Sequence, residues 1–493
     1  MLFNSLEFVF FFVVVTVLYF TLPQKYRWFL LLAASCYFYM FFIPYYIVIL
    51  FSTIIIDYFA VIQIERATGR KRKLYLIFSL IANIGILMVF KYYNFFIDNI
   101  NFFNQSIFKA DPLPYWSIIL PVGLSFHTFQ ALSYSIEVYR GNHKAERHFG
   151  IYALYVMFYP QLVAGPIERP QNMLHQFYEK HHVDLIRIAN GLKLMAWGLF
   201  KKVVIADRLA IVVNQVYDHP QQYEGTALII ATVFFAFQIY CDFSGYTDIA
   251  LGAAEVMGFR LMKNFNAPYL AKNIADFWKR WHISLSTWFR DYLYISIGGS
   301  KVKISRWYFN LLFVFIVSGF WHGANWTFII WGALNGIYLV AAVVKEKFFA
   351  KKKKVKESLV SEIFQIVTTF ILVSFAWIFF RANSWSDAWY IVTHLTSNLF
   401  SKVIALKSYL NSGLFSGFFG IKIKNFDFTE WVLCFVLIVI LFITDTIINR
   451  HGDIVSYVNK KPAAVRWILY YVIILSIIFL GKFGEAKFIY FQF

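Results

Sequence analysis

Long apolar runs dominate this 493-residue chain and limit what it can fold into. Hydrophobic residues make up 60% of the sequence, whereas soluble domains contain about 45–50%. Charged residues make up only 15% and gather between the apolar runs, as in a membrane protein whose loops carry the solvated charge. The runs lie at residues 8–22, 28–42, 45–64, 74–93, 116–138, 151–163, 185–200, 226–240, 248–259, 307–320, 326–344, 359–380, 431–448 and 465–480.

The lengths of these runs predict a polytopic, all-α membrane protein. A helix needs about 20 apolar residues to cross a bilayer, and several runs are shorter. We therefore expect about ten to twelve crossings together with re-entrant and in-plane helices. The first run should remain as a span, because no basic region precedes it and no small-residue cleavage site follows it. No internal repeat or Pro/Ser-rich linker divides the chain, so residues 1–493 are expected to form one membrane domain.

The formal net charge of +19 is best explained by membrane topology. Nucleic-acid binding is excluded because the basic residues flank candidate spans. Three clusters are expected on the cytoplasmic side: Arg66, Arg70, Lys71, Arg72 and Lys73; Lys201, Lys202 and Arg208; and Lys345, Lys347 and Lys351 to Lys354. The run 351–354 has a second interpretation, contact with anionic lipid or an acidic cofactor. The mixed segment 384–427 is the expected extracytoplasmic excursion.

Residues 277–292 predict an amphipathic helix that carries a histidine, His282. Trp278, Trp281, Leu285, Trp288 and Tyr292 recur at helical spacing and form an aromatic stripe. The opposite side carries Lys279, Arg280, Ser286, Arg290 and Asp291. Such a helix suits the headgroup boundary and should lie flat. A histidine there has a simpler interpretation as a solvated surface residue.

A second histidine, His322, is expected inside the membrane. His322 follows Arg306 by sixteen residues, and a helix of that length spans roughly 24 Å at about 1.5 Å per residue. The hydrocarbon core of a bilayer is about 30 Å thick, so His322 should lie within it. Arg306 and Lys345 flank a hairpin with both ends inside, so its turn should lie in the outer half; a re-entrant loop is the competing geometry. An intramembrane ionisable group suggests function, although a core histidine bonded to a carbonyl is the alternative.

Further polar residues at membrane depth are candidates for a substrate-binding site. His127, Asp242, Ser244 and Asp248 could line a tunnel. Trp321 and Asn325 flank His322, and Asn325 could donate a hydrogen bond to an oxyanion, although packing explains it equally well.

Other classes of site are not indicated by the sequence. The three cysteines lie inside apolar runs and give neither a disulfide framework nor a metal-ligand spacing, so no metal is expected. The sequence lacks Gly-x-Ser-x-Gly, His-Glu-x-x-His and phosphate-loop motifs, which argues against a serine hydrolase, a metalloprotease or a P-loop ATPase.

Several motifs together resemble those of the membrane-bound O-acyltransferases (MBOAT), in the bacterial branch that acetylates alginate. The run Trp281-His282-Ile283-Ser284-Leu285-Ser286 and the turn Trp321-His322-Gly323 resemble the family signature. Matching segments also occur at residues 120–130, 159–167, 242–250 and 488–493, in the same order and across nearly the whole chain.

The resemblance implies helices around a central tunnel, with His322 as the membrane-embedded catalytic base and His282 positioning the donor or polarising its carbonyl. It implies transfer of an acyl group, acetyl in the first instance, from a cytoplasmic thioester such as acetyl-CoA to a hydroxyl of a cell-envelope polysaccharide. Transfer would be direct or through an extracytoplasmic SGNH-type partner, in the bacterial inner membrane and without a bound cofactor. The alternative is a transporter or polysaccharide-export subunit with proton-relay histidines, which inverted repeats would favour.

Overall fold

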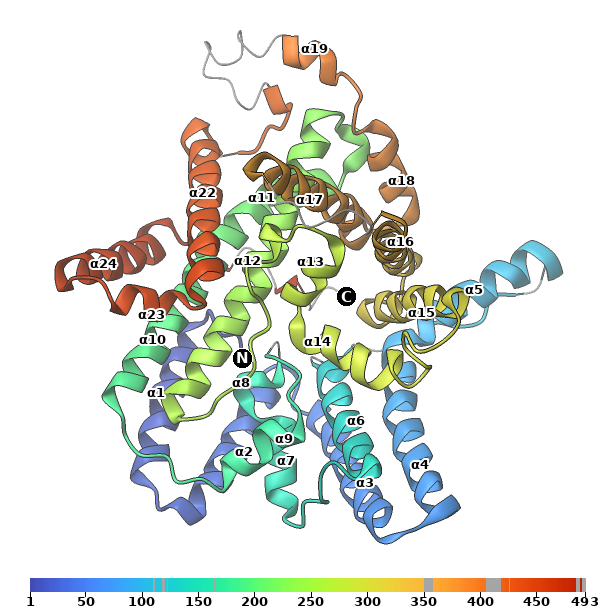
Figure 1. Ribbon diagram of the computed structural model, residues 1–493, viewed down its shortest axis with the longest axis vertical. Coiled ribbons are helices and arrows are strands. Elements are labelled where there is room, and N and C mark those ends of the chain that lie inside the picture. The colour runs from blue at the N-terminus through green and yellow to red at the C-terminus, as the bar shows by residue number, and fades with distance from the viewer. Residues whose placement is uncertain are drawn as a thin grey trace. The chain divides into compact units, whose positions relative to one another are not determined.

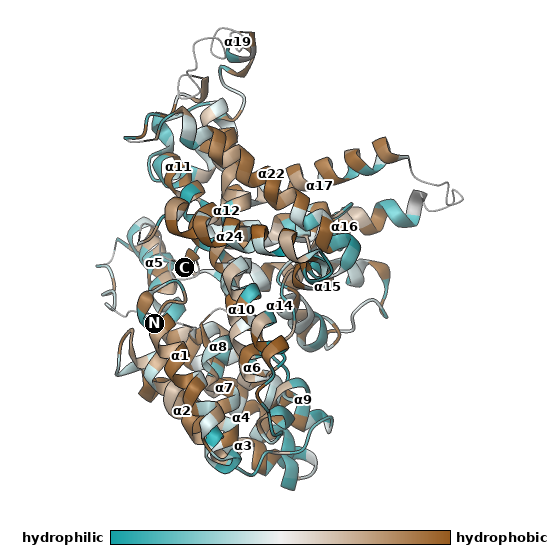
Figure 2. Cartoon of the chain, turned by 90° about the vertical axis from the view of Figure 1, so that its left-hand side faces the viewer, coloured by the Kyte–Doolittle hydropathy of each residue, from teal (hydrophilic) through white to brown (hydrophobic). Residues whose placement is uncertain are grey.

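The computed structural model describes residues 1–109, 111–117, 120–121, 123–163, 165–349, 358–404, 418–424, 426–484 and 488–489. Within these ranges every regular element is a helix, which confirms the all-α prediction. Figure 2 shows the apolar character of the long helices as brown colouring, for example along α17 (Leu359–Arg381) and α22 (Phe428–His451). Helices that are apolar on most sides are suited to lipid.

Eight of the described helices are long and apolar enough to cross a membrane, so the chain is a multi-pass membrane protein. A ninth apolar helix, α1 (Leu6–Thr21), is shorter, at 16 residues. The ten to twelve crossings expected from the sequence also counted shorter runs, and several of these form helices of 9 to 17 residues. The eight are Tyr46–Arg66, Gly69–Phe108, Thr226–Met257, Ile304–His322, Trp326–Lys347, Leu359–Arg381, Phe428–His451 and Ala463–Leu480.

Residues Met1–Met195 and Thr247–Lys263 form one compact unit. A buried polar contact joins three of its helices: Asp57 accepts hydrogen bonds from Ser79 (2.6 Å) and Asn83 (2.8 Å), and Ser79 also contacts Ser135 (3.0 Å). A buried carboxylate needs such partners. The elements, coloured blue to green in Figure 1, are α1, α2 (Gln24–Met40), α3 (Tyr46–Arg66), α4 (Gly69–Leu87), η1 (Met88–Tyr92), α5 (Tyr93–Phe103), η2 (Asn104–Phe108), α6 (Leu124–Arg140), α7 (Phe149–Met157), α8 (Tyr159–Leu162), α9 (Pro170–Met173), η3 (Leu174–Phe177) and most of α10 (Leu185–Leu199).

Residues Ala196–Tyr246 and Asn264–Phe493 form the second unit, which contains both candidate histidines. Helix α12 (Thr226–Met257) belongs to this unit up to Tyr246. The other elements are η4 (Phe200–Ala206), α11 (Asp207–Tyr217), η5 (Pro220–Gln222), η6 (Pro268–Leu270), α13 (Ile274–Arg280), α14 (Ile283–Trp288), η7 (Phe289–Tyr294), α15 (Ile304–His322), α16 (Trp326–Phe349), α17, α18 (Trp385–His394), α19 (Leu399–Ile404), α22, α23 (Ile454–Asn459) and α24 (Ala463–Leu480).

Two of the expected loops extend beyond the described residues. The Lys351 to Lys354 run lies outside the described residues. The segment 384–427 contains α18 and α19, and its residues 405–417 and 425 also lie outside the described part.

Candidate functional site

His322 is the last residue of α15 and is 5% exposed. Its ring meets three aromatic rings edge to face: Trp321 at 4.9 Å, Trp331 of α16 at 5.1 Å and Phe380 of α17 at 5.3 Å between centroids. Such packing removes water from the imidazole and fixes its orientation. The structure therefore places His322 in a buried aromatic environment at the end of a membrane helix.

Close packing of α15 against α16 brings Trp331 beside His322. A Cβ added to Gly319 would overlap the carbonyl oxygen of Phe328, and one added to Gly332 would overlap that of Phe315. Small residues at such positions let two membrane helices approach closely. The two glycines thus set the spacing of the hairpin that carries His322 (Figure 1).

His282 lies at a break between two helices, which corrects the prediction of one continuous amphipathic helix over residues 277–292. Helix α13 ends at Arg280 and α14 begins at Ile283. Between them His282 adopts φ +43°, a left-handed conformation that is uncommon for residues other than glycine. The turn carries the imidazole into the protein, where it is 1% exposed rather than solvated at the headgroup boundary.

The aromatic stripe of this region was predicted correctly, even though the helix is broken. Trp281, Leu285, Trp288 and Tyr292 are buried, and Trp278 is half-buried. On the polar side Lys279 and Arg290 are exposed, and Arg280, Ser286 and Asp291 are half-buried. The local hydrophobic period therefore described each short helix but not the turn between them.

Asn264 fixes the orientation and tautomer of His282. The backbone N–H and Oγ of Ser284 donate to Asn264 Oδ1 at 3.1 and 2.7 Å, and His282 Nδ1 lies 3.3 Å from the same oxygen. A backbone N–H can only donate, so this Asn264 atom is the oxygen and Nδ1 carries the proton. Nε2 then holds the lone pair of the neutral ring. Burial lowers the pKa of His282, which lies outside the eight candidate spans, to about 3, so the ring is neutral at pH 7.

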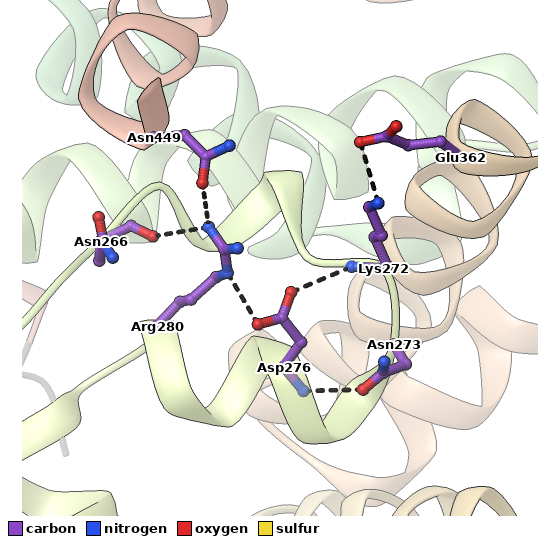
Figure 3. Close-up of polar contacts among 7 residues, drawn as sticks. All are labelled: Asn266, Lys272, Asn273, Asp276, Arg280, Glu362 and Asn449. Atoms are coloured by element: carbon purple, nitrogen blue, oxygen red, sulfur yellow. Dashed lines mark hydrogen bonds and ion pairs between the residues drawn. The ribbon is translucent and has the colours of Figure 1, made fainter. Parts of the chain in front are cut away.

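Helix α13, which leads into His282, is held from two sides (Figure 3). Arg280 bonds Asp276 at 3.0 Å within the helix and the side chain of Asn449 on α22 at 2.7 Å. Lys272, just before the helix, pairs with Glu362 of α17 at 3.2 Å. The exposed arginine expected from the sequence is therefore part of the support for the site.

A continuous line of ring contacts connects the two histidines within the second unit. From His322 it passes through Trp331, Trp377 (5.7 Å), Trp281 (5.1 Å) and Phe265 (5.1 Å). From Phe265 it continues through Phe243 (5.1 Å) to His282 (4.7 Å). The structure thus assembles both histidines on one aromatic wall, although 40 residues separate them in the sequence.

A cavity of about 470 Å³ adjoins this wall between α13, α14, η7, α15 and α16. Its lining reaches Ile283, next to His282, and Ser318, four residues before His322 and on the same face of α15. Neither histidine is among its lining residues. Most of the lining is apolar, with Ser286, Lys279 and Arg290 among its polar groups.

Asp242 anchors Ile489 to a buried ion-pair network. Lys202 Nζ lies 2.7 Å from both Asp242 and Asp207, and the backbone N–H of Ile489 donates to Asp242 at 2.7 Å. Burial opposes the charge on Lys202, but Asp242 and Asp207 outweigh it and raise the lysine pKa. Phe488, the preceding residue, packs on Phe243 with 6.1 Å between the ring centroids. Phe243 is the ring that contacts His282.

This network corrects the prediction of a solvated basic loop at Lys201, Lys202 and Arg208. All three side chains are at most 4% exposed. Lys201 donates to Ser244 Oγ at 2.8 Å, and Arg208 pairs with Glu430 of α22. The π-helix η4 continues α10 where a loop was expected. The basic residues of this segment therefore lie inside the unit, where they bond side chains of other helices.

The remaining predicted site residues have different surroundings. Asn325 caps α16, accepting from Thr327 N at 3.0 Å and donating to Asn383 O at 3.4 Å. His127 on α6 is 2% exposed and belongs to the first unit, where its ring nitrogens meet no hydrogen-bonding group among the described residues. Asp248 also belongs to the first unit and is half-buried. Trp321 packs directly against His322.

Sequence patterns did not identify Asn264, Ser284, Lys202 or Trp331 as parts of the site. Asn264 lies 18 residues before His282 in an irregular segment, so no period relates the two. Lysine in a basic cluster is normally solvated, and its pairing with Asp242, 40 residues later, requires the tertiary fold. Trp331 has helical spacing from nearby aromatics, which by itself indicates packing.

Comparison with known proteins shows the family of this chain. A family model described as MBOAT, membrane-bound O-acyltransferase family, matches residues 16–385. The chain is 38% identical over 392 residues to a probable alginate O-acetylase, AlgI, of Azotobacter vinelandii, covering 79% of this chain and 77% of the relative. It is 38% identical over 363 residues to a peptidoglycan O-acetyltransferase of Helicobacter pylori, covering 68% and 67%. It is 28% identical over 293 residues to a teichoic acid D-alanyltransferase of Bacillus subtilis, covering 56% and 73%. The chain belongs to the membrane-bound O-acyltransferase family.

Proposed function

We propose that this O-acyltransferase moves an acetyl group from a cytoplasmic thioester, acetyl-CoA or another acyl thioester, to a hydroxyl of a cell-envelope polysaccharide. The names of the relatives, alginate O-acetylase and peptidoglycan O-acetyltransferase, support acetyl as the group and a glycan as the acceptor. The enzyme would work in the bacterial inner membrane. Transfer is direct or passes through an extracytoplasmic SGNH-type partner.

The observation that carries this proposal is a buried histidine on an aromatic wall beside a 470 Å³ cavity. In the proposed reaction the oxygen of the acceptor hydroxyl attacks the thioester carbonyl while His322 takes the hydroxyl proton. The C–S bond then breaks, and the imidazolium returns the proton to the leaving thiolate. A dry site protects the thioester from hydrolysis and strengthens hydrogen bonds to the reacting oxygen.

His282 is proposed to position the donor. Its Nδ1–H points to Asn264, so the neutral ring presents an acceptor at Nε2. An acceptor there suits an amide N–H of the donor arm, whereas polarising a carbonyl would need a donor. The hydrogen bonding therefore favours positioning over carbonyl polarisation.

The 470 Å³ cavity is proposed to hold the arm of the thioester donor. Its walls are apolar near Trp278 and Phe315, and the exposed cations Lys279 and Arg290 also line it. Cationic side chains attract the phosphates of an acyl-CoA or of a carrier-protein arm. The cavity reaches the neighbours of both histidines, so an arm lying in it would end near the proposed reaction centre.

The function is tested by measuring acetyl esters in the envelope polysaccharide of cells with and without the gene. Base-labile acetate should disappear on deletion and return when the wild-type chain is supplied. The amount of secreted polysaccharide should stay the same, because only its modification is lost. Unchanged acetate would contradict the proposal, and loss of secretion itself would indicate an export subunit instead.

Replacing Asn264 is expected to test the tautomer of His282. Asn264→Ala should lower turnover by roughly 10–100-fold, the usual effect of removing an orienting partner behind a site residue. Asn264→Asp should place an anion beside Nδ1 and raise the pKa of His282 from about 3. Activity needs the neutral ring, so on acidification Asn264→Asp should lose activity at a higher pH than the wild type does.

The pH–rate profile separates this positioning role from a purely structural one. A structural defect would lower turnover at all pH values without moving the acidic limb. Asn266→Asp provides a matched control, because Asn266 is a nearby asparagine that contacts Arg280 through its backbone carbonyl and N–H. An unmoved acidic limb in Asn264→Asp would contradict the assigned tautomer.

A further inference from the structure

Asp57 is a buried carboxylate near the middle of α3, one of the helices long and apolar enough to cross a membrane. It is 0% exposed. In the described part of the chain its hydrogen-bond partners are the neutral side chains of Ser79 and Asn83, and no cationic side chain pairs with it. An ionisable group inside a membrane is costly, and it usually has a charged partner or a function. The residues around Asp57 supply no such charge.

The hydrogen bonds to Asp57 fit the ionised form of its carboxylate. Ser79 Oγ lies 2.6 Å from Asp57 Oδ1, the short distance expected for a hydroxyl that donates to a charged oxygen. Asn83 Nδ2 donates to Oδ1 and to Oδ2, at 2.8 Å each. Both carboxylate oxygens therefore act as acceptors, whereas a protonated carboxyl would donate from one of them.

Two further buried oxygens in this cluster, Asn83 Oδ1 and Tyr152 Oη, meet no hydrogen-bonding group among the described residues. The groups around Asn83 Nδ2 are acceptors, the Asp57 oxygens and the carbonyl of Ser79 at 2.9 Å, so the other amide atom is an oxygen. Tyr152 of α7 lies close enough to Asp57 to interact with its charge. Buried oxygens of this kind indicate a bound group that satisfies them.

The cluster around Asp57 offers only oxygen atoms and a single negative charge. Carboxylate, carbonyl and hydroxyl oxygens are the ligands that hard cations prefer. Ca²⁺ takes about six to eight oxygen ligands, and Mg²⁺ keeps several of its waters. A sealed cluster with one carboxylate and a few neutral oxygens instead matches the charge of a monovalent cation. In agreement, the described residues contain no group of three His, Cys, Asp or Glu side chains that could hold a metal ion.

We propose that Asp57, Asn83 and Tyr152 bind one sodium ion between α3, α4 and α7 of the first unit. The ion would compensate the charge of Asp57 and accept lone pairs from Asn83 Oδ1 and Tyr152 Oη. Ser79 would orient the carboxylate, and Ser135 of α6, 3.0 Å away, would orient Ser79. An ion bound by three helices stabilises the folded unit, because it binds the folded state and not the unfolded one. The site goes beyond the proposed function and does not depend on it.

The test measures thermal unfolding of the full chain in nanodiscs of neutral lipid, in sodium chloride and in N-methyl-D-glucamine chloride of equal ionic strength. Wild type should be more stable in sodium chloride, and the gain should grow with the logarithm of the sodium concentration. Potassium chloride should give a smaller gain, because the larger ion fits the cluster less well. Binding of radioactive sodium to the same nanodiscs measures the affinity directly.

Two variants of the cluster should change the response to sodium in different degrees. Asp57→Asn should abolish sodium binding and unfold at the same temperature in both salts, because a neutral amide needs no compensating ion. Tyr152→Phe removes one ligand oxygen and keeps the ring, so it should weaken sodium binding about tenfold in a folded protein.

Matched controls separate sodium binding from a general loss of buried polar groups. Ser133→Ala removes another buried hydroxyl of the same unit, whose partner is the carbonyl of Gln130 at 2.7 Å, and should keep wild-type affinity. Asp445→Asn removes a buried carboxylate of α22 and should keep it too. Equal stability of wild type in the two salts would overturn the site, as would a sodium response that persists in Asp57→Asn. A stability that depends on Asp57 through pH alone would also overturn it, since the bound cation would then be a proton.

Discussion

Acyl transfer should fall by about 10²–10⁴-fold when His322 is replaced by alanine, the range typical of removing a general base. The residue is buried among Trp321, Trp331 and Phe380, whose aromatic rings cannot take over as a base. The measurement is acetate released from the glycan by base, normalised to the amount of membrane-inserted protein. Substrate affinity should change little, because the imidazole acts on the proton that moves in the transition state.

A matched histidine distinguishes this result from a general effect of losing an imidazole. His451 lies at the end of α22, is exposed and stacks on Tyr457 at 4.8 Å. His451→Ala should keep full transfer. If His322→Ala retained turnover at normal protein level, the base would have to be sought elsewhere, and His282 would be the first residue to test.

Local pattern and membrane physics predicted the position of His322 well. The long apolar run after the basic flank at Arg306 predicted a membrane helix, and the helix rise placed the histidine near its far end. The structure adds what those arguments could not supply. Trp331 and Phe380 reach His322 from two other helices, and their contact depends on how α15, α16 and α17 pack.

His282 shows where periodicity stops being informative. The stripe of Trp281, Leu285 and Trp288 fits one helix, and every one of these residues is buried as expected. A single residue with positive φ nevertheless divides that helix and turns its imidazole inward. The conformation is stabilised by Asn264, whose side chain and backbone carbonyl bind Ser284 and Ile283, and no local signal reveals so distant a partner.

The buried lysine was misassigned for a related reason. Sequence arguments treat clusters of lysine as solvated, which holds when no carboxylates return to them. Here Asp242, itself selected as a polar residue at membrane depth, is the carboxylate that compensates the charge of the buried Lys202. Two separate observations, a basic cluster and an intramembrane aspartate, are thus one structural feature that also holds the segment at Ile489.

Lys202→Met is expected to destabilise the protein by about 3–5 kcal/mol, the usual cost of removing one partner of a buried ion pair. The substitution leaves Asp207 and Asp242 buried, at 1% and 2% exposure, without the cation that compensates them. The free energy of unfolding can be measured by denaturant titration in mixed micelles. Transfer should fall as well, because Asp242 holds Ile489, and the preceding residue Phe488 packs on Phe243, the ring that contacts His282.

An exposed ion pair and a charge-free variant identify the cause of this loss. Lys272 pairs with Glu362 at 3.2 Å with both side chains about 40% exposed (38% and 41%), so Lys272→Met should cost only about 0–1 kcal/mol. Adding Asp207→Asn and Asp242→Asn to Lys202→Met removes the uncompensated charges and should recover much of the lost stability, because most of the penalty belongs to buried carboxylates left without a cation. If the triple variant were no more stable than Lys202→Met, lost packing of the lysine stem would be the cause, and the network would owe little of its strength to charge.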